Sequence, residues 1–378
     1  MAAFYIFGVH RSLTTIRKLF NLKLKILNIK IIYGLWLIHH AKRIMNGNNG
    51  FRHETVRERW DMTLHTAGIH HITAYAQDPQ KNVDFYTGVL GLRMVKKTVN
   101  YDAPEVYHLY FGDEGGQPGT IITFFPSSAS RRGLRGGGQA GYTTFAVPVG
   151  ALPYWEQRLR SFGVPVMKAF RFNEQYLQFS DRDGLSLELV EREGGPNNGW
   201  SVDDITPDTA IKGFGGAVLF SSKWEETKKA LENVMGLTYI GEDVNYARFQ
   251  AAGPFGNVID LPMRDIPLGA GGAGTTHHIA WRAQDDEEHG KWHEWVKEQG
   301  FRPTDIRNRN YFKALYFRER GGILFEIATD PPGFTVDEDL HSLGEQLKLP
   351  AWFEPERARI EQGLEPIQVK NTGEGQLK

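Results

Sequence analysis

From Met62 onward, the apolar and polar residues repeat one outline four times along the chain. Each repeat begins with an apolar strand, continues with a helix whose apolar residues recur at helical spacing, and closes with further strands. The repeats run approximately over 68–125, 140–191, 213–262 and 275–328. Units of about 50–60 residues are too small to bury their own sheet face, so we expect them to pack in pairs. The pattern predicts an α+β fold of four βαβββ modules.

The predicted helices all stop at a glycine, the residue that most often follows the last turn of a helix. They cover approximately residues 80–90, 152–162, 225–235 and 287–299, and the glycines are Gly91, Gly163, Gly236 and Gly300. A glycine- and asparagine-rich stretch at 194–199 separates the second module from the third. We therefore predict two domains of two modules each, with a linker between them and a tail behind them: 62–193, 194–212 (linker), 213–345 and 346–378 (tail).

Two positions of the repeat carry residues that could bind a metal. At the opening strand the matched residues are His71, Thr144, Ala217 and His278, and four residues after the glycine of the closing strand they are Thr123, Glu188, Asp260 and Glu326. The first and fourth modules thus supply two imidazoles and a carboxylate, whereas the middle two supply no imidazole. We expect the outermost modules to fold face to face and to aim His71, His278 and Glu326 at one point.

The chemistry of that set favours a mononuclear metal site. The sequence has no cysteine, so a metal must be bound by histidine and carboxylate. Two imidazoles and one carboxylate form the facial triad of non-haem Fe(II), which leaves coordination positions open for substrate and O2; the same set suits Mn(II). Glu326 stands between Phe325 and Ile327, where an unpaired charge would be costly.

Each of these residues also has a structural interpretation. A single histidine in an apolar strand is more often a core or surface residue than a ligand, and only two matched pairs with a matched glutamate favour the metal. Neighbouring residues of a strand point to opposite faces, which makes cavity roles for His70 and His277 weaker than those of His71 and His278.

Residues 1–61 differ from the rest of the chain. They hold eleven Lys/Arg and three Asp/Glu, a net +8, so the remainder carries −9 of the overall −1. The acidic remainder of the chain, from Met62 on, lacks the basic face that nucleic-acid binding needs.

Within residues 1–61, the apolar run at 31–38 is far shorter than the roughly 20 residues of a membrane span, and no secretory signal is evident. We expect a poorly ordered extension; a basic helix on a membrane surface is the alternative. The absence of cysteine fits a cytoplasmic protein.

Several motifs resemble one known superfamily: 68–73 (GIHHIT), 107–113 (YHLYFGD), 277–278 (HH) and 321–326 (GGILFE). They are similar to the vicinal oxygen chelate superfamily, and within it to the hydroquinone-cleaving branch, which includes the chlorohydroquinone 1,2-dioxygenases. The likeness runs from about 66 to about 365, with further matches at 309–318 and 330–334. It implies that the modules pair into two half-barrel domains. The family pattern lacks the N-terminal extension.

The resemblance also assigns residues. It places the metal ligands on His71, His278 and Glu326, and the histidine that supports a ligand on His70. It places the pocket arginine on Arg309, the pocket tyrosine on Tyr316 and, less firmly, a pocket threonine on Thr73.

The resulting prediction is an Fe(II)-dependent, extradiol-type ring-cleaving dioxygenase for a hydroquinone or catechol, with O2 as co-substrate and a role in aromatic compound degradation. His70, His277 or Tyr316 would move protons, and Arg309 would steady an anionic substrate. A glyoxalase-I-like isomerase is the second candidate, although it normally needs two ligands from each of two units and Thr123 stands in the fourth place. A non-enzymatic protein that sequesters a flat toxic molecule is the third. The sequence leaves homo-oligomerisation open.

Overall fold

The structure, a computed structural model, describes residues 64–369. The extension predicted over 1–61 lies outside the described residues. Between residues 64 and 369, none of the helices is long and apolar enough to cross a membrane.

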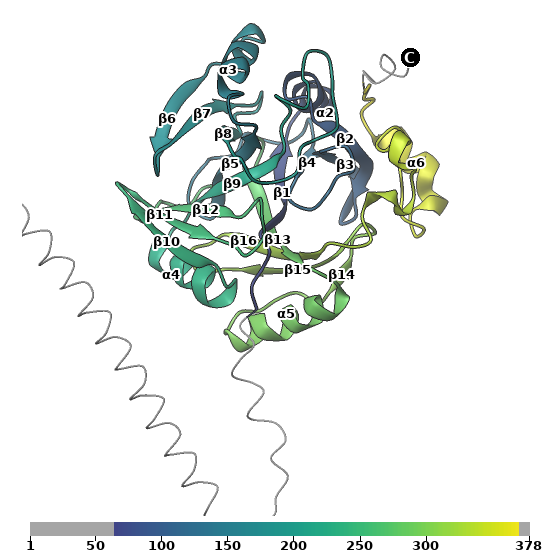
Figure 1. The fold of residues 1–378 in the computed structure, drawn as a ribbon. Coiled ribbons are helices and arrows are strands. Elements are labelled where there is room, and N and C mark those ends of the chain that lie inside the picture. Colours follow the sequence, from purple (N-terminus) through teal and green to yellow (C-terminus); the bar gives the residue numbers. More distant parts are fainter. Residues whose placement is uncertain (1–63, 370–378) are drawn as a thin grey trace, which may run out of the picture. The chain divides into compact units, whose positions relative to one another are not determined.

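The first of two eight-stranded sheets combines the first and fourth modules, and it is the one that carries the candidate site (Figure 1). Its strand order is β14-β15-β16-β13-β1-β4-β3-β2. Its strands are β1 (Ile69–Ala76), β2 (Arg93–Asn100), β3 (Ala103–Gly112), β4 (Ile121–Pro126), β13 (Thr276–Ala283), β14 (Arg307–Asn308), β15 (Lys313–Arg318) and β16 (Leu324–Thr329).

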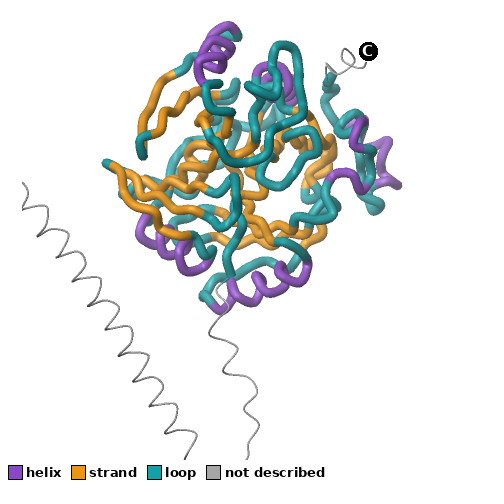
Figure 2. The backbone as a smooth tube through the Cα atoms, in the orientation of Figure 1, coloured by secondary structure: helices purple, strands orange, loops and turns teal. Residues whose placement is uncertain are grey.

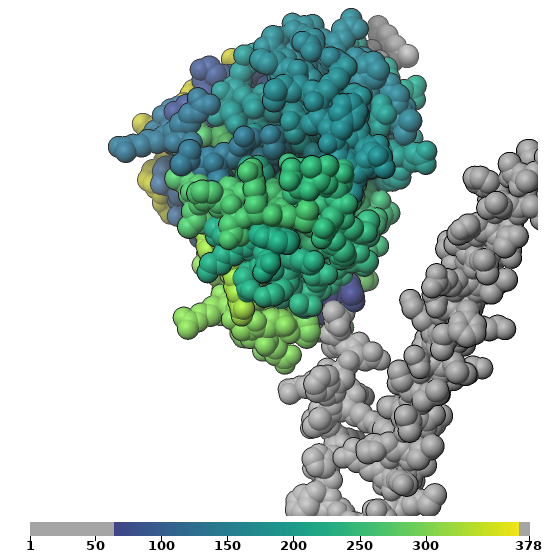
Figure 3. Space-filling model, turned by 90° about the vertical axis from the view of Figure 1, so that its left-hand side faces the viewer, coloured from purple at the N-terminus to yellow at the C-terminus, as the bar shows by residue number. Residues whose placement is uncertain are grey.

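The second sheet combines the second and third modules in the equivalent order, β10-β11-β12-β9-β5-β8-β7-β6. Its strands are β5 (Gln139–Val147), β6 (Met167–Arg171), β7 (Glu174–Ser180), β8 (Ser186–Glu191), β9 (Gly213–Phe220), β10 (Thr238–Asp243), β11 (Tyr246–Gln250) and β12 (Val258–Pro262). Figure 3 views the molecule from the side of this sheet, with the segment around residue 150 above the segment around residue 250.

Each sheet curls into a half-barrel, and the predicted α+β fold of four modules in two half-barrels is confirmed. The two modules of each half-barrel meet through an antiparallel pair of opening strands, β1 with β13 and β5 with β9. Each sheet therefore contains strands from both predicted ranges, 62–193 and 213–345. The division of the chain into domains at those boundaries stays a prediction.

Helices lie on the outer surface of the sheets, as the tube view shows (Figure 2). Two of the four module helices end in a π-helical turn, which the sequence pattern does not distinguish from an α-helix. The module helices are α2 (Pro79–Val83) with η1 (Asp84–Val89), α3 (Leu152–Ser161), α4 (Trp224–Lys229) with η2 (Ala230–Val234), and α5 (Asp286–Glu298). The C-terminal segment adds η3 (Phe334–Val336), η4 (Leu340–Ser342), η5 (Glu354–Glu356) and α6 (Arg357–Gly363).

The start of β1 is fixed by two backbone contacts, one with the turn before β12 of the second sheet and one with the turn before β4 of its own sheet. The Ile69 amide donates to the Gly256 carbonyl at 2.9 Å, and the Gly119 amide donates to the His70 carbonyl at 2.8 Å. Gly119 has φ +94°, and a Cβ atom there would lie 2.5 Å from the Phe255 ring, so only glycine fits this turn. These contacts hold the strand that carries His70 and His71 in place.

Candidate metal centre

Strand register brings the three predicted ligands to one face of the first sheet. His71 on β1 lies opposite Ala280 on β13, and Ala280 lies beside Glu326 on β16. His278 precedes Ala280 by two residues and therefore shares its face, because side chains alternate along a strand.

The ligand atoms of the three residues lie within 4.8 Å of one another. His278 Nε2 lies 2.8 Å from a Glu326 carboxylate oxygen, His71 Nε2 lies 3.4 Å from the same oxygen, and the two Nε2 atoms are 3.2 Å apart. Ligands held at about 2.1 Å from one ion would show separations of this size. All three residues are buried.

Charge and hydrogen bonding fit a cation at this point. Burial raises the pKa of the Glu326 carboxyl, but the proximity of the His71 and His278 rings outweighs burial and holds that pKa well below its usual range. Burial lowers the pKa of His278 despite the nearby carboxylate. Among residues 64–369, neither Glu326 oxygen has a hydrogen-bond partner of good geometry. A buried carboxylate without such partners is costly unless a cation satisfies it.

Both ligand histidines are held by the histidine that precedes them. His70 Nδ1 lies 2.9 Å from His71 Nδ1, and His277 Nδ1 lies 2.6 Å from His278 Nδ1. His70 Nε2 lies 3.2 Å from the Thr329 carbonyl, which can only accept, so Nε2 carries the proton of a neutral His70. His70 Nδ1 then accepts from His71 Nδ1–H, which leaves the lone pair of His71 Nε2 directed at the ligand cluster.

Simple alternation would have placed the two residues of each pair on opposite faces, and two strand irregularities prevent this. The β1–β13 register shifts between Ile69 and His71 and again at His277, so that His70 and His277 are each one residue extra to the ladder. A β-bulge breaks the alternation of side chains and re-aims them. Each preceding histidine consequently lies beside the following one.

A cavity of about 400 Å³ opens next to the cluster and is lined by His71, His278, Glu326, His277, Arg309 and Tyr316, among others. Its size is ordinary for a small-molecule site. Burial lowers the pKa of His277 to about 3, so this cavity histidine is neutral at physiological pH. His70 and Thr73 do not line the cavity: His70 lies behind His71, and Thr73 is fully buried with its hydroxyl 2.8 Å from that of Thr123.

Arg309 and Tyr316 form one wall. Arg309 Nε donates to the Tyr316 hydroxyl at 3.2 Å, and its Nη2 donates to Asp102 at 2.9 Å. Burial, followed by the charge of Glu326, raises the pKa of Tyr316 well above its usual value, so the phenol keeps its proton. This wall thus offers a fixed positive charge beside a neutral hydroxyl.

Several cavity residues were not predicted from the sequence, among them Asp102, His108 and Tyr110. Asp102 lies in the turn between β2 and β3 and reaches Arg309 across the cavity mouth. His108 and Tyr110 are two residues apart on β3, so they share a face. That spacing within the motif at 107–113 was the available signal.

In the second sheet, the corresponding position is filled by ion pairs. The Arg171 guanidinium bonds both oxygens of Glu188, at 2.9 and 2.6 Å, and also contacts Asp260. Arg248 bonds Asp260 at 2.7 Å and Glu174 at 2.6 Å. Two arginines thus neutralise the carboxylates that the second and third modules place here.

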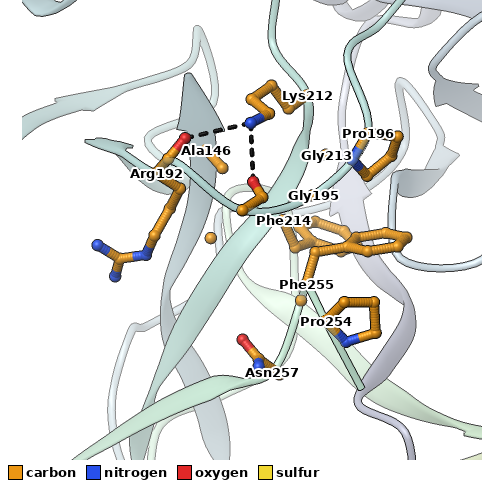
Figure 4. Close-up of a pocket in the computed structure, with 13 residues that line it drawn as sticks. Ala146, Arg192, Gly195, Pro196, Lys212, Gly213, Phe214, Pro254, Phe255 and Asn257 are labelled. Atoms are coloured by element: carbon orange, nitrogen blue, oxygen red, sulfur yellow. Dashed lines mark hydrogen bonds between the residues drawn. The ribbon is translucent and has the colours of Figure 1, made fainter. Parts of the chain in front are cut away.

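A second hollow lies near the linker, where Figure 4 shows Lys212 beside Phe214 and Phe255. Its volume is only about 40 Å³. The Lys212 ammonium already donates to the carbonyls of Arg192, Glu193 and Gly194. This hollow offers neither the space nor the free groups of a catalytic site.

Comparison with known families agrees with this architecture. Residues 68–189 and 213–335 match the model of the Glyoxalase/Bleomycin resistance protein/Dioxygenase superfamily. These two ranges cover the modules of both half-barrels. The chain belongs to this superfamily.

Two curated relatives are similar over most of their length. The "Putative ring-cleaving dioxygenase MhqO" of Bacillus subtilis is 56% identical over 309 residues, which cover 82% of this chain and 99% of the relative. The "Chlorohydroquinone/hydroquinone 1,2-dioxygenase" of Sphingobium indicum is 35% identical over 296 residues, 75% of this chain and 91% of the relative.

Solved structures show the same fold. The crystal structure of a "putative dioxygenase" from Bacillus subtilis is 56% identical and superimposes with a TM-score of 0.80, covering 81% of this chain and 99% of that one. Glyoxalase I from Zea mays is 15% identical, with a TM-score of 0.54, covering 74% of this chain and 97% of that one. The second likeness concerns the fold alone.

Proposed function

We propose that the protein is an Fe(II)-dependent, extradiol-type dioxygenase that cleaves the ring of a hydroquinone or catechol with O2. The observation that carries the proposal is the convergence of His71, His278 and Glu326 beside a cavity of about 400 Å³. The two relatives, named as a putative ring-cleaving dioxygenase and a chlorohydroquinone/hydroquinone 1,2-dioxygenase, support the reaction class. We place the activity in the cytoplasm, in keeping with a sequence without cysteine.

His71, His278 and Glu326 would hold the metal on one side and leave its other side open to the cavity. The chemistry that Fe(II) supplies when bound is the joint binding of a ring oxygen and O2, with electron transfer between them. The donor set also suits Mn(II), so the identity of the metal is part of the proposal.

His70 and His277 would orient the two ligand histidines in different ways. His70 is anchored by the Thr329 carbonyl and sealed behind His71, so its role is to fix the ring of that ligand. His277 lines the cavity, and its Nδ1 is engaged by His278. If His278 Nδ1–H donates to His277 Nδ1, a neutral His277 presents its Nε2–H to the substrate.

Arg309 and Tyr316 would bind the substrate from the flank beside β16. The guanidinium places a permanent positive charge near the position where a diphenol loses its proton, and this charge favours the phenolate. Tyr316, held by Arg309, would give or accept a hydrogen bond at the same oxygen. We expected His70, His277 or Tyr316 to move protons. His277 and Tyr316 line the cavity, and we assign that task to them; His70 does not line the cavity.

Thr123 argues against a glyoxalase-type isomerase. The Thr123 hydroxyl lies 2.8 Å from the Thr73 hydroxyl and 2.8 Å from His108 Nε2. The Thr123 side chain is fully buried and does not line the cavity. The position that would supply a fourth ligand is therefore occupied by a neutral, fully engaged group.

Anaerobic reconstitution with Fe(II), followed by oxygen-electrode assays on catechols and hydroquinones, tests the proposal. We expect one Fe(II) per chain and O2 uptake with at least one diphenol. The His278→Ala variant should lose both. A matched control is His289→Ala, because His289 is equally buried but bonds the Ile327 carbonyl outside the cluster. Wild-type protein that binds no iron, or consumes no O2 with any diphenol, would refute the proposal; turnover of a methylglyoxal–thiol adduct would favour the isomerase.

A further inference from the structure

A chain of four hydrogen-bonding groups runs from the core of the first module to the cavity wall. The Thr73 and Thr123 hydroxyls are 2.8 Å apart, Thr123 lies 2.8 Å from His108 Nε2, and His108 Nδ1 lies 2.9 Å from the Tyr110 hydroxyl. His108 and Tyr110 line the cavity, whereas the two threonines are fully buried behind them. The functions assigned so far use neither His108 nor Tyr110.

The direction of the hydrogen bonds follows from the buried end of this chain. Within the described part of the protein, the Thr73 hydroxyl has Thr123 as its single partner. If Thr73 accepted from Thr123, its own proton would be buried without an acceptor, which is costly. Thr73 therefore donates to Thr123, and Thr123 in turn donates to His108 Nε2.

The same logic fixes the groups at the cavity. Burial, followed by the charges of His71 and His278, lowers the pKa of His108 well below its usual value, so the ring is neutral and has one N–H. Because Nε2 accepts from Thr123, the proton is on Nδ1, which donates to the Tyr110 oxygen. The phenolic proton of Tyr110 is then left without an internal acceptor.

Tyr110 also has a counterpart in the fourth module. Tyr110 pairs with Thr123 across β3 and β4, and Tyr316 pairs with Glu326 across β15 and β16. In the strand order, β3 and β15 stand at equivalent places on opposite sides of the central β1–β13 pair. The two tyrosines therefore flank the metal centre from opposite sides of the half-barrel.

The surroundings of the Tyr110 hydroxyl keep its proton in place. Burial, then Tyr101, Tyr316 and Glu326, raise the pKa of Tyr110 well above its usual value. A phenol of this kind remains a hydrogen-bond donor throughout the physiological pH range.

We propose that Tyr110 is a substrate-contacting residue that donates a hydrogen bond to the ring oxygen not held by the metal, and that His108 positions it for this contact. This inference rests on the proposed function, because it takes the ligand to be a diphenol bound through one oxygen at the metal centre. It assigns the two flanks different tasks: Arg309 and Tyr316 bind beside the metal-bound oxygen, and Tyr110 binds the second oxygen.

Calorimetric titration of hydroquinone and of phenol into the metal-loaded protein under anaerobic conditions tests the assignment. Phenol lacks the second oxygen and so offers Tyr110 nothing to bind. The Tyr110→Phe variant should weaken hydroquinone binding roughly two- to tenfold, the usual effect of losing one such hydrogen bond, and leave phenol binding and metal content unchanged. Tyr239→Phe is the matched control, because Tyr239 lies in the second sheet with its hydroxyl on Glu242.

A double-mutant cycle tests the positioning role of His108. His108→Gln should weaken hydroquinone binding in the wild-type background and have little further effect in Tyr110→Phe, because both changes act through the same hydroxyl. Equal weakening of hydroquinone and phenol in Tyr110→Phe, or no weakening of either, overturns the inference, as do additive effects of the two substitutions.

The two proposals fail in different ways. Wild-type protein that binds hydroquinone more tightly than phenol but consumes no O2 would refute the dioxygenase and leave the role of Tyr110 standing. O2 uptake by a wild-type protein whose preference for hydroquinone survives in Tyr110→Phe would refute only the role of Tyr110. Wild-type protein that binds no diphenol at all would refute both.

Discussion

His70 offers the sharpest test of how the centre is assembled. In the His70→Ala variant, the Nδ1–H of His71 loses its acceptor at 2.9 Å in a site with almost no solvent. An unsatisfied buried donor costs about 1–3 kcal/mol. Because about 1.4 kcal/mol corresponds to a factor of ten, Fe(II) affinity should fall roughly 5- to 150-fold. Losses of about 10- to 100-fold are typical when the group that holds a metal-binding histidine is removed.

The assay is competition for Fe(II) between the protein and a chelator of known affinity under anaerobic conditions. His289→Ala serves as the control, since it removes an equally buried histidine that contacts the Ile327 carbonyl and none of the ligands. We expect this control to lower stability and to leave Fe(II) affinity unchanged, because His289 contacts none of the three ligands. Wild-type affinity in His70→Ala would refute the hydrogen-bond chain from Thr329 to His71.

Three further predictions concern stability and the cavity mouth. Arg171→Met should lower the free energy of unfolding by about 3–5 kcal/mol in urea titrations. Adding Glu188→Leu should restore part of the lost stability, because the buried carboxylate is then removed as well. An unchanged unfolding midpoint in Arg171→Met would contradict the ion-pair account. Burial holds the pKa of His277 near 3 in the folded chain, below the 6.5 of an unfolded histidine, so the unfolded state binds the extra proton between these values. As the pH falls below about 6.5, this residue should therefore lower the free energy of unfolding of the metal-free protein by about 1.4 kcal/mol per pH unit. In the same titrations, the free energy of unfolding of His277→Phe should depend less steeply on pH. Asp102→Asn should change stability by less than about 1 kcal/mol because the carboxylate is exposed, but should tighten binding of an anionic ring compound such as benzoate by freeing Arg309; weaker binding would contradict this.

Much of the fold was predictable because the modules share one pattern. The glycines matched across the four closing strands, Gly119, Gly184, Gly256 and Gly322, all have positive φ, which explains why each module keeps a glycine at that place. The pairing of the outermost modules followed from their residues, since only those two carry imidazoles at the opening strand. Their meeting through β1 and β13 is what the structure shows.

Other features depend on geometry that no periodic pattern encodes. The bulges at His70 and His277 shift the register by one residue, and alternation along a strand cannot reveal such an insertion. The partners of Arg171 lie 17 and 89 residues away, so the ion-pair cluster of the second sheet becomes visible only after folding. Asp102 likewise reaches Arg309 across more than 200 residues of sequence. The ligand roles of His71, His278 and Glu326 remain predictions.

The central claim is that these three residues hold one metal ion. A crystal structure of the chain grown anaerobically with Fe(II), with diffraction data collected at the iron absorption edge, tests it most directly. We predict one anomalous peak about 2.1 Å from His71 Nε2, His278 Nε2 and a Glu326 oxygen, with open coordination positions facing the cavity. A peak elsewhere, or no peak at this cluster in iron-loaded crystals, would contradict the account.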